Sequence, residues 1–230
     1  MIGVLDSGVG GENTVRELFG IASADVVLMK DTKNAPYGTK GADELAKITN
    51  DNIEHLLSLG AERVLIACCT ASTVWDMLGE RAREYSIPII RPTAEAARAA
   101  TRTGRIAAVA TAGTVARRAF SRALPGLSVT ELAAGELVGA VEGGMCDGSV
   151  GEEDEKFLRR VLDPLSHSGA DTLILGCTHF PSLGESIGRI VREYGIRNII
   201  SSARCGAEAL VREYPHHGGG GLEIIDTGRP

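Results

Sequence analysis

Two cysteines of this sequence, Cys68 and Cys177, each directly follow a short apolar run. These runs, residues 64–67 and 173–176, are typical of buried parallel strands, and ligands of α/β proteins bind beyond the carboxyl ends of such strands. A thiol is a base only after losing its proton, with a reference pKa of about 8.5. One thiolate and one thiol on opposite faces of a bound molecule could remove a proton from one side of a carbon and return one to the other, which inverts its stereochemistry.

The residues beside each cysteine suit proton transfer. Residues 70–72 follow Cys68 and are expected to begin a helix, whose N–H groups and dipole favour a negative charge nearby. His179 stands two positions after Cys177 and is a candidate partner for that thiol. The sequence therefore predicts two acid–base centres, one at the end of each strand.

Predicted strands and helices alternate along the chain. Apolar runs bounded by Gly, Pro or polar residues predict strands at 2–5, 25–29, 64–67, 87–90, 105–110, 127–130, 173–176, 198–200 and 222–225. Pro88 favours a sheet edge for its strand. Helices are expected around 15–18, 42–59, 75–78, 94–100, 136–142, 152–165 and 203–214, and a glycine-rich hinge at 216–221 includes His216 and His217. This alternation predicts an α/β fold with mostly parallel sheets flanked by helices.

The pattern of the first half recurs in the second half. Asp6 and Thr111 each end a predicted strand and lie 105 positions apart, and Cys68 and Cys177 lie 109 positions apart. Near-equal offsets for two independent strand ends indicate an internal duplication. We therefore predict two pseudo-symmetric α/β domains, residues 1–93 with 203–230 and residues 94–202, whose cleft collects these four side chains.

Charge and composition disfavour several functional classes. The 230 residues carry 24 basic and 30 acidic side chains, a net charge of −6, without long runs of like charge, which disfavours nucleic-acid binding. No segment approaches the roughly 20 apolar residues needed to cross a bilayer, and residues 2–5 follow Met1 without a secretory signal. Five cysteines fit free thiols in a reducing compartment better than a disulfide framework. We expect a cytoplasmic protein that binds neither nucleic acid nor membranes.

Taken together and in this order, the motifs resemble those of the glutamate racemases of the aspartate/glutamate racemase superfamily. The resemblance covers nearly the whole chain. It rests on Asp6-Ser7-Gly8-Val9-Gly10-Gly11, Asp31-Thr32 with Pro36-Tyr37-Gly38, Ala67-Cys68 with Thr70-Ala71, Thr111 with Gly113-Thr114, Glu142, and Gly176-Cys177-Thr178-His179.

The resemblance implies an enzyme that interconverts L- and D-glutamate without a cofactor or metal and supplies the D-isomer for peptidoglycan. It also implies an amino-acid substrate in the interdomain cleft and a homodimer. Cys68 and Cys177 would be the acid–base thiols, Asp6 would assist Cys68, and His179 with Glu142 would assist Cys177. The implied substrate-binding residues are Ser7, Pro36, Tyr37, Gly38, Cys69, Thr70, Thr111, Thr114 and Thr178.

The chain departs from the family pattern at Cys69, where Asn is usual, and at residues 12–14, where Glu-Asn-Thr replaces an apolar stretch. An amide donates two N–H groups to the amino-acid head group, and a thiol, a weak donor, does not replace them. Racemisation of aspartate or another acidic amino acid therefore stays open, as does an amino-acid-binding relative without turnover. A redox protein using Cys68 and Cys69 is a more distant alternative. A nucleotide site at residues 8–11 is disfavoured because the glycine spacing is not Gly-x-Gly-x-x-Gly.

Overall fold

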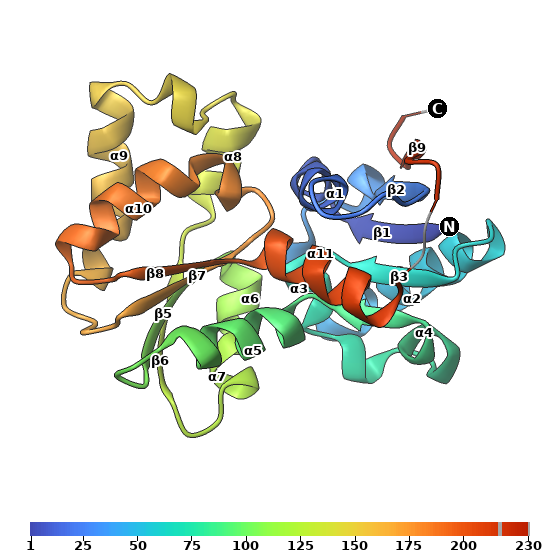
Figure 1. Ribbon diagram of the computed structural model, residues 1–230, viewed down its shortest axis with the longest axis horizontal. Helices are drawn as coiled ribbons and strands as arrows, with labels where there is room; N and C mark the ends of the chain where they lie inside the picture. Colours follow the sequence, from blue (N-terminus) through green and yellow to red (C-terminus); the bar gives the residue numbers. More distant parts are fainter. Residues whose placement is uncertain (216–217, 230) are drawn as a thin grey trace.

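A computed structural model describes residues 1–215 and 218–229 of the chain. Within those residues the strands form two sheets, and every pair of neighbouring strands is parallel (Figure 1). The first sheet has the order β4-β3-β1-β2-β9 and consists of β1 (Ile2–Asp6), β2 (Val26–Lys30), β3 (Arg63–Ile66), β4 (Ser86–Pro88) and β9 (Leu222–Asp226). The second has the order β6-β5-β7-β8 and consists of β5 (Arg105–Ala110), β6 (Ser128–Ala133), β7 (Thr172–Gly176) and β8 (Asn198–Ser201).

The two sheets share one strand order, since β4-β3-β1-β2 corresponds to β8-β7-β5-β6. The neighbours β1 and β3 lead to Asp6 and Cys68, and the neighbours β5 and β7 lead to Thr111 and Cys177. This is the arrangement that an internal duplication predicts. β9 pairs with β2, so the C-terminal segment returns to the first sheet. The domain limits, 1–93 with 203–230 and 94–202, stay a prediction.

Helices cover the sheets and occupy the junction between them. The α-helices are α1 (Gly11–Phe19), α2 (Ala42–Ser58), α3 (Cys69–Ser72), α4 (Glu80–Glu84), α5 (Ile90–Ala100), α6 (Ala112–Ala116), α7 (Ala119–Ala123), α8 (Glu136–Glu142), α9 (Glu152–Leu162), α10 (Gly184–Glu193) and α11 (Ser202–Glu213). The 3-10 helices are η1 (Thr32–Asn34), η2 (Tyr37–Thr39), η3 (Trp75–Met77), η4 (Asp147–Ser149), η5 (Asp163–Leu165) and η6 (Phe180–Leu183). Of the helices described, none is both long and apolar enough to span a bilayer.

Helices α5 and α11 join the two halves (Figure 1). Ala97 of α5 and Leu210 of α11 belong to one buried cluster with Val4 of the first sheet and with Ile106 and Ile174 of the second. Burial of apolar area contributes about 25 cal/mol per Å². The cluster therefore stabilises the relative position of the sheets as well as each sheet.

The nine predicted strands are all present, but two local predictions are wrong. The helix expected at 75–78 is only η3, because the chain becomes extended at Leu78 and α4 starts anew after Gly79. The strand expected at 87–90 ends at Pro88, and Ile90 already belongs to α5. Pro88 does lie in an edge strand, where its missing N–H is tolerated.

Helix α10 was not expected from the sequence, which places glycines at 184 and 188. Its apolar face, with Ile187, Ile190 and Val191, is completely buried, so tertiary packing outweighs the low helix propensity of glycine. The predicted hinge residues His216 and His217 lie outside the described residues.

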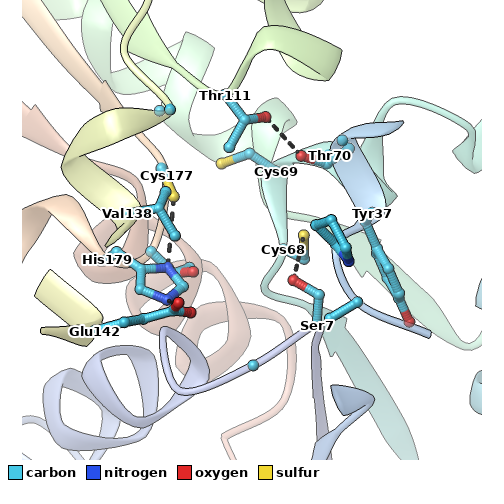
Figure 2. Close-up of a pocket in the computed structure, with 17 residues that line it drawn as sticks. Ser7, Tyr37, Cys68, Cys69, Thr70, Thr111, Val138, Glu142, Cys177 and His179 are labelled. Carbon is cyan, nitrogen blue, oxygen red and sulfur yellow. Dashed lines mark hydrogen bonds and ion pairs between the residues drawn. The ribbon is translucent and has the colours of Figure 1, made fainter. Parts of the chain in front are cut away.

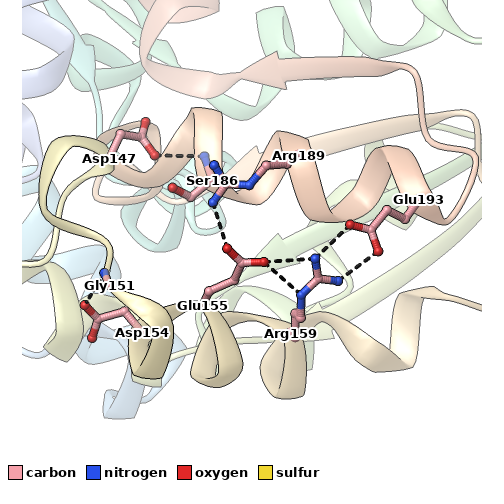
Figure 3. Close-up of polar contacts among 8 residues, drawn as sticks. All are labelled: Asp147, Gly151, Asp154, Glu155, Arg159, Ser186, Arg189 and Glu193. Carbon is pink, nitrogen blue, oxygen red and sulfur yellow. Dashed lines mark hydrogen bonds and ion pairs between the residues drawn. The ribbon is translucent and has the colours of Figure 1, made fainter.

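Polar contacts attach α10 to the segment around α9 (Figure 3). The Asp147 carboxylate accepts hydrogen bonds from the backbone N–H groups of Glu185 (2.9 Å) and Ser186 (2.8 Å), which otherwise lack partners at a helix start. Arg159 of α9 bridges Glu155 (2.9 Å) and Glu193 of α10 (2.8 Å). These contacts support the segment that follows Cys177.

Candidate active site

A cavity of about 470 Å³ lies where the carboxyl ends of the two sheets face each other. Figure 2 shows Ser7, Tyr37 and Cys68 on one side of it, Cys177, His179 and Glu142 on the other, and Cys69 between them in this view. The lining residues are Ser7, Gly8, Ala35, Pro36, Tyr37, Gly38, Cys68, Cys69, Thr70, Thr111, Gly135, Val138, Glu142, Gly176, Cys177, Thr178 and His179. The structure therefore brings residues from both halves of the sequence to one cavity.

Cys68 stands at the end of β3 and is the N-cap residue of α3. Its sulfur lies 3.6 Å from the Ser7 hydroxyl. Burial and the negative charge of Asp6 raise the pKa of the Cys68 thiol to about 11, although the N–H of Ala71 and the Ser7 hydroxyl act in the opposite direction. The sequence correctly placed a helix start beside this thiol, but removal from water outweighs the helix N–H groups.

Cys177 directly follows β7 and has a different set of partners. Its sulfur lies 3.6 Å from Nδ1 of His179, and Nε2 of the same ring lies 3.3 Å from a carboxylate oxygen of Glu142. Burial raises the pKa of Cys177 well above its ordinary value, and the neighbouring Cys69 contributes in the same direction. Cys177, His179 and Glu142 thus form a chain of contacts that leads from the cavity to the surface, where Glu142 is about half exposed.

Asp6 is completely buried and does not line the cavity. Its carboxylate accepts hydrogen bonds from the N–H of Gly8 and from the hydroxyl of Thr178, each at 2.9 Å. Burial raises the pKa of Asp6, while nearby His179 acts in the opposite direction. The carboxylate therefore joins the Cys68 half to the segment that carries Cys177, a contact that the sequence does not reveal.

Three threonine hydroxyls form a closed set across the two halves. Thr70 lies 2.9 Å from Thr111 and 3.1 Å from Thr114, and the latter two lie 3.0 Å apart (Oγ1 to Oγ1). Thr70 and Thr111 line the cavity, whereas Thr114 is buried behind them. Thr114, predicted to bind substrate, is therefore placed to orient the other two hydroxyls.

The loop containing Pro36, Tyr37 and Gly38 forms part of the wall near Cys68. The hydroxyl of Tyr37 donates to Asp31 at 2.6 Å, which leaves the ring rather than the hydroxyl facing the cavity. Burial and Asp31 raise the pKa of this tyrosine. Gly38 packs against Gly113 of the other half. A Cβ added to Gly113 would lie 2.6 Å from the Gly38 carbonyl oxygen.

Cys69 lines the cavity and is only 3% exposed. Burial raises its pKa, so the side chain is an uncharged thiol, and the Ser202 hydroxyl opposes this shift. No lysine or arginine is found among the residues that line the cavity. A carboxylate bound there would rely on hydroxyl and backbone N–H donors.

Several lining residues were not predicted from the sequence. Val138 and Gly135 belong to or precede α8, the helix that also carries Glu142. Val138 lies one helical turn before Glu142, a spacing that places both side chains on one face and could have identified it. Gly8 and Gly176 have no side chain and Ala35 has only a methyl group, so their residue types do not indicate a functional site.

Comparison with known proteins identifies the family. A model of the Asp/Glu/Hydantoin racemase family matches residues 12–210. The glutamate racemase of Desulforudis audaxviator is 39% identical over 196 residues, covering 83% of this chain and 71% of the relative. That of Gloeobacter violaceus is 38% identical over 197 residues, covering 83% and 72%.

Solved structures agree with this assignment. Glutamate racemase RacE1 from Bacillus anthracis has a TM-score of 0.86 at 28% identity, covering 100% of this chain and 89% of that chain. The Francisella tularensis glutamate racemase in complex with D-glutamate has a TM-score of 0.85 at 25% identity, covering 100% and 88%. The chain therefore belongs to the Asp/Glu/hydantoin racemase family. The relatives and structures named above are glutamate racemases, so the predicted resemblance, the two-domain α/β fold and the enzyme class, an isomerase, are confirmed.

Proposed function

We propose that this protein interconverts L- and D-glutamate, with Cys68 and Cys177 as the two acid–base groups and no cofactor. The observation that carries the proposal is the placement of these thiols at equivalent strand ends, on different walls of one cavity and with separate polar partners. The substrate follows from the glutamate racemases that the chain resembles over most of its length. Supply of D-glutamate for peptidoglycan is part of the same proposal.

The mechanism uses one thiol at a time as the base. For L-glutamate, Cys177 takes the proton from Cα and Cys68 gives its own proton to the opposite face; for D-glutamate the roles reverse. Burial keeps both thiols protonated before a substrate binds, because their pKa values are raised. The substrate ammonium group introduces a positive charge that favours the thiolate. Contacts from His179 to Cys177 and from Ser7 to Cys68 assist each transfer.

Deprotonation at Cα also requires stabilisation of the charge that develops on the adjacent carboxylate. Thr70 and Thr111 present hydroxyls to the cavity, and the starts of α3 and α6 lie beside them. Fixed donors in a site shielded from water stabilise such charge without reorganisation during the reaction. Asp6 orients Thr178, and Glu142 orients His179, as positioning groups in this scheme.

The aspartate alternative is retained because of Cys69. A thiol at this position removes amide donors from the head-group site, which changes how substrates of different length are held. The chain also resembles an aspartate racemase from Picrophilus torridus, but at 17% identity that likeness extends to the fold alone. Glutamate therefore remains the favoured substrate.

The test is exchange at Cα in heavy water with L-glutamate, D-glutamate and both aspartate isomers, followed by NMR and polarimetry. We expect glutamate to exchange and to reach zero optical rotation, and C68S and C177S to lower the racemisation rate by roughly 100–10,000-fold each, as for loss of a general acid–base group. Exchange of aspartate alone would establish the alternative substrate. Tight binding of glutamate without exchange would show a binding protein instead.

The proposal also includes the cellular compartment and the oligomeric state. All five cysteines are free thiols, which fits action in the reducing cytoplasm. We also propose that the protein forms a homodimer, because its sequence resembles those of the glutamate racemases.

A further inference from the structure

The turn that carries His179 is held from the opposite half of the molecule. Asn13, in the first turn of α1, donates from Nδ2 to the backbone carbonyl of Thr178 at 2.7 Å and to the hydroxyl of Ser182 at 3.1 Å. These two acceptors lie at the beginning and the end of the turn that contains His179. One side chain of the first half therefore fixes both ends of a catalytic segment of the second half.

The orientation of the Asn13 amide is determined by its other neighbour. The guanidinium of Arg16 donates to Oδ1 of Asn13 at 2.8 Å. A guanidinium has no acceptor, so the amide oxygen must face Arg16 and the NH₂ group must face Thr178 and Ser182. The amide is thus presented as a donor to the turn.

Other contacts between the first half of the molecule and this turn are equally close. Asp6 accepts the Thr178 hydroxyl, and Gly10 lies so near the turn that an added Cβ would be 2.7 Å from Nδ1 of His179. Asn13 differs from Asp6 and Gly10 because its side chain donates to the backbone carbonyl of Thr178, the residue beside Cys177. Like them, it does not line the cavity. It therefore affects the reaction only through the position of the turn.

We infer that Asn13 is a positioning residue, which sets the place of Cys177 and His179 relative to Cys68 across the interdomain cleft. The kinetic part of this inference rests on the proposed function. A displacement of about 1 Å in a catalytic group can lower the rate by about 100-fold. Loss of the hydrogen bond from Asn13 to Thr178 can therefore have a measurable effect on the rate. The substitution of Glu-Asn-Thr for an apolar stretch at residues 12–14 supplies this donor.

The experiment compares N13A and N13D with wild type. N13D keeps the size of the side chain and its contact with Arg16 but replaces the donor by an acceptor that faces the Thr178 carbonyl. We expect both variants to lower kcat by roughly 10–100-fold with KM within about 2-fold, because the group misplaced is catalytic and not substrate-binding. E17Q is the matched control on the same helix, since Glu17 pairs with Arg204 of α11 and not with the turn; it should retain wild-type kcat.

Isotope effects separate positioning from a general loss of structure. Because mirror-image isomers have an equilibrium constant of 1, kcat/KM must fall equally in both directions. With 2-deuterated substrates, however, the isotope effect on kcat/KM should rise for L-glutamate, whose proton Cys177 removes, and fall for D-glutamate. Unchanged kcat, or isotope effects that keep the wild-type ratio while the melting temperature drops, would overturn the inference.

A second measurement does not require racemisation. Alkylation by iodoacetamide, read by peptide mass spectrometry, should show a change of at least about 3-fold in the ratio of Cys177 to Cys68 labelling in N13A, because thiol reactivity follows the groups around it. An unchanged labelling ratio would show that Asn13 does not determine the position of Cys177 and its partners. If wild type exchanges no amino acid at Cα, the proposed function fails, and this labelling ratio still decides the role of Asn13.

Discussion

Removal from water dominates the chemistry of the cavity thiols. Cys68 and Cys177 are each 7% exposed and both have raised pKa values, although Cys68 caps a helix and Cys177 contacts a histidine. The sequence correctly predicted that a helix begins beside Cys68 and that His179 lies near Cys177. It did not predict how deeply the two thiols are buried. Burial depends on residues far away in the chain, which short motifs do not contain.

The first prediction at this scale concerns the ionisation of Cys68. Its pKa of about 11 means that the thiol form dominates below pH 11 and that the thiolate fraction falls tenfold for each unit of lower pH. The rate of Cys68 alkylation by iodoacetamide, followed by mass spectrometry, should therefore keep rising from pH 7 past pH 9.5. The exposed Cys146 in the same digest serves as an internal reference for reagent activity. A plateau for Cys68 below pH 9 would contradict this assignment.

The second prediction concerns Cys69, whose thiol lines the cavity where the resemblance to the glutamate racemases implies an asparagine. Restoring the amide in C69N adds two N–H donors to the cavity wall, and one charge-assisted hydrogen bond contributes about 1.5–3 kcal/mol. We expect the KM for glutamate to fall by roughly 10–100-fold in steady-state racemisation assays.

Cys205 provides the control for that substitution. It is also a buried free thiol, but it does not line the cavity, so C205S should leave the KM near that of wild type. A C69N variant with unchanged or higher KM for glutamate would show that position 69 does not contact the head group of the substrate.

At the scale of elements, the strands were predictable and the connections were less so. Strands β3 and β7 consist mostly of consecutive apolar residues. Helices α6 and α7 have five residues each, which is little more than one turn and too short to show a helical periodicity. The contact between η2 and α6 illustrates the limit. It brings Gly38 to Gly113, and nothing in either local sequence indicates that the two glycines meet.

This contact gives a prediction for G113A. An added Cβ would lie 2.6 Å from the Gly38 carbonyl oxygen and 2.8 Å from its Cα, so the loop containing Tyr37 must move away from α6. Since that loop lines the cavity, we expect the KM for glutamate to rise by at least roughly 10-fold and the melting temperature to fall, with an overpacking cost of about 1–3 kcal/mol. Kinetics and thermal unfolding measure the two effects.

The matched control is G139A in α8. No atom lies within 4 Å of a Cβ added there, and the residue is exposed within a helix. Replacing such a glycine by alanine should stabilise the protein by about 0.5–1 kcal/mol. Equal kinetic effects of G113A and G139A would show that the two glycines respond to helix propensity alone and that the contact with Gly38 is unimportant.

At the scale of the whole molecule, the sequence predicted two related halves because equivalent strand ends recur at similar offsets, and the shared strand order agrees. It could not predict how the halves dock. The bonds from Asp6 to Thr178, from Asn13 to Thr178 and from Thr70 to Thr111 each join the two halves, and none follows a local pattern. Most predicted site residues converge on the cavity for this reason, while Asp6 and Thr114 lie behind its wall.

The two walls of the cavity are not copies of each other, since one thiol faces a serine and the other a histidine backed by a glutamate. In the proposed reaction this inequality cannot favour either isomer in amount, because mirror images have the same free energy in water. An isomer that is processed with a higher kcat must instead have a KM higher by the same factor. One isomer can therefore saturate the enzyme at concentrations where the other does not, and the direction of net flow is set by whichever isomer the cell consumes.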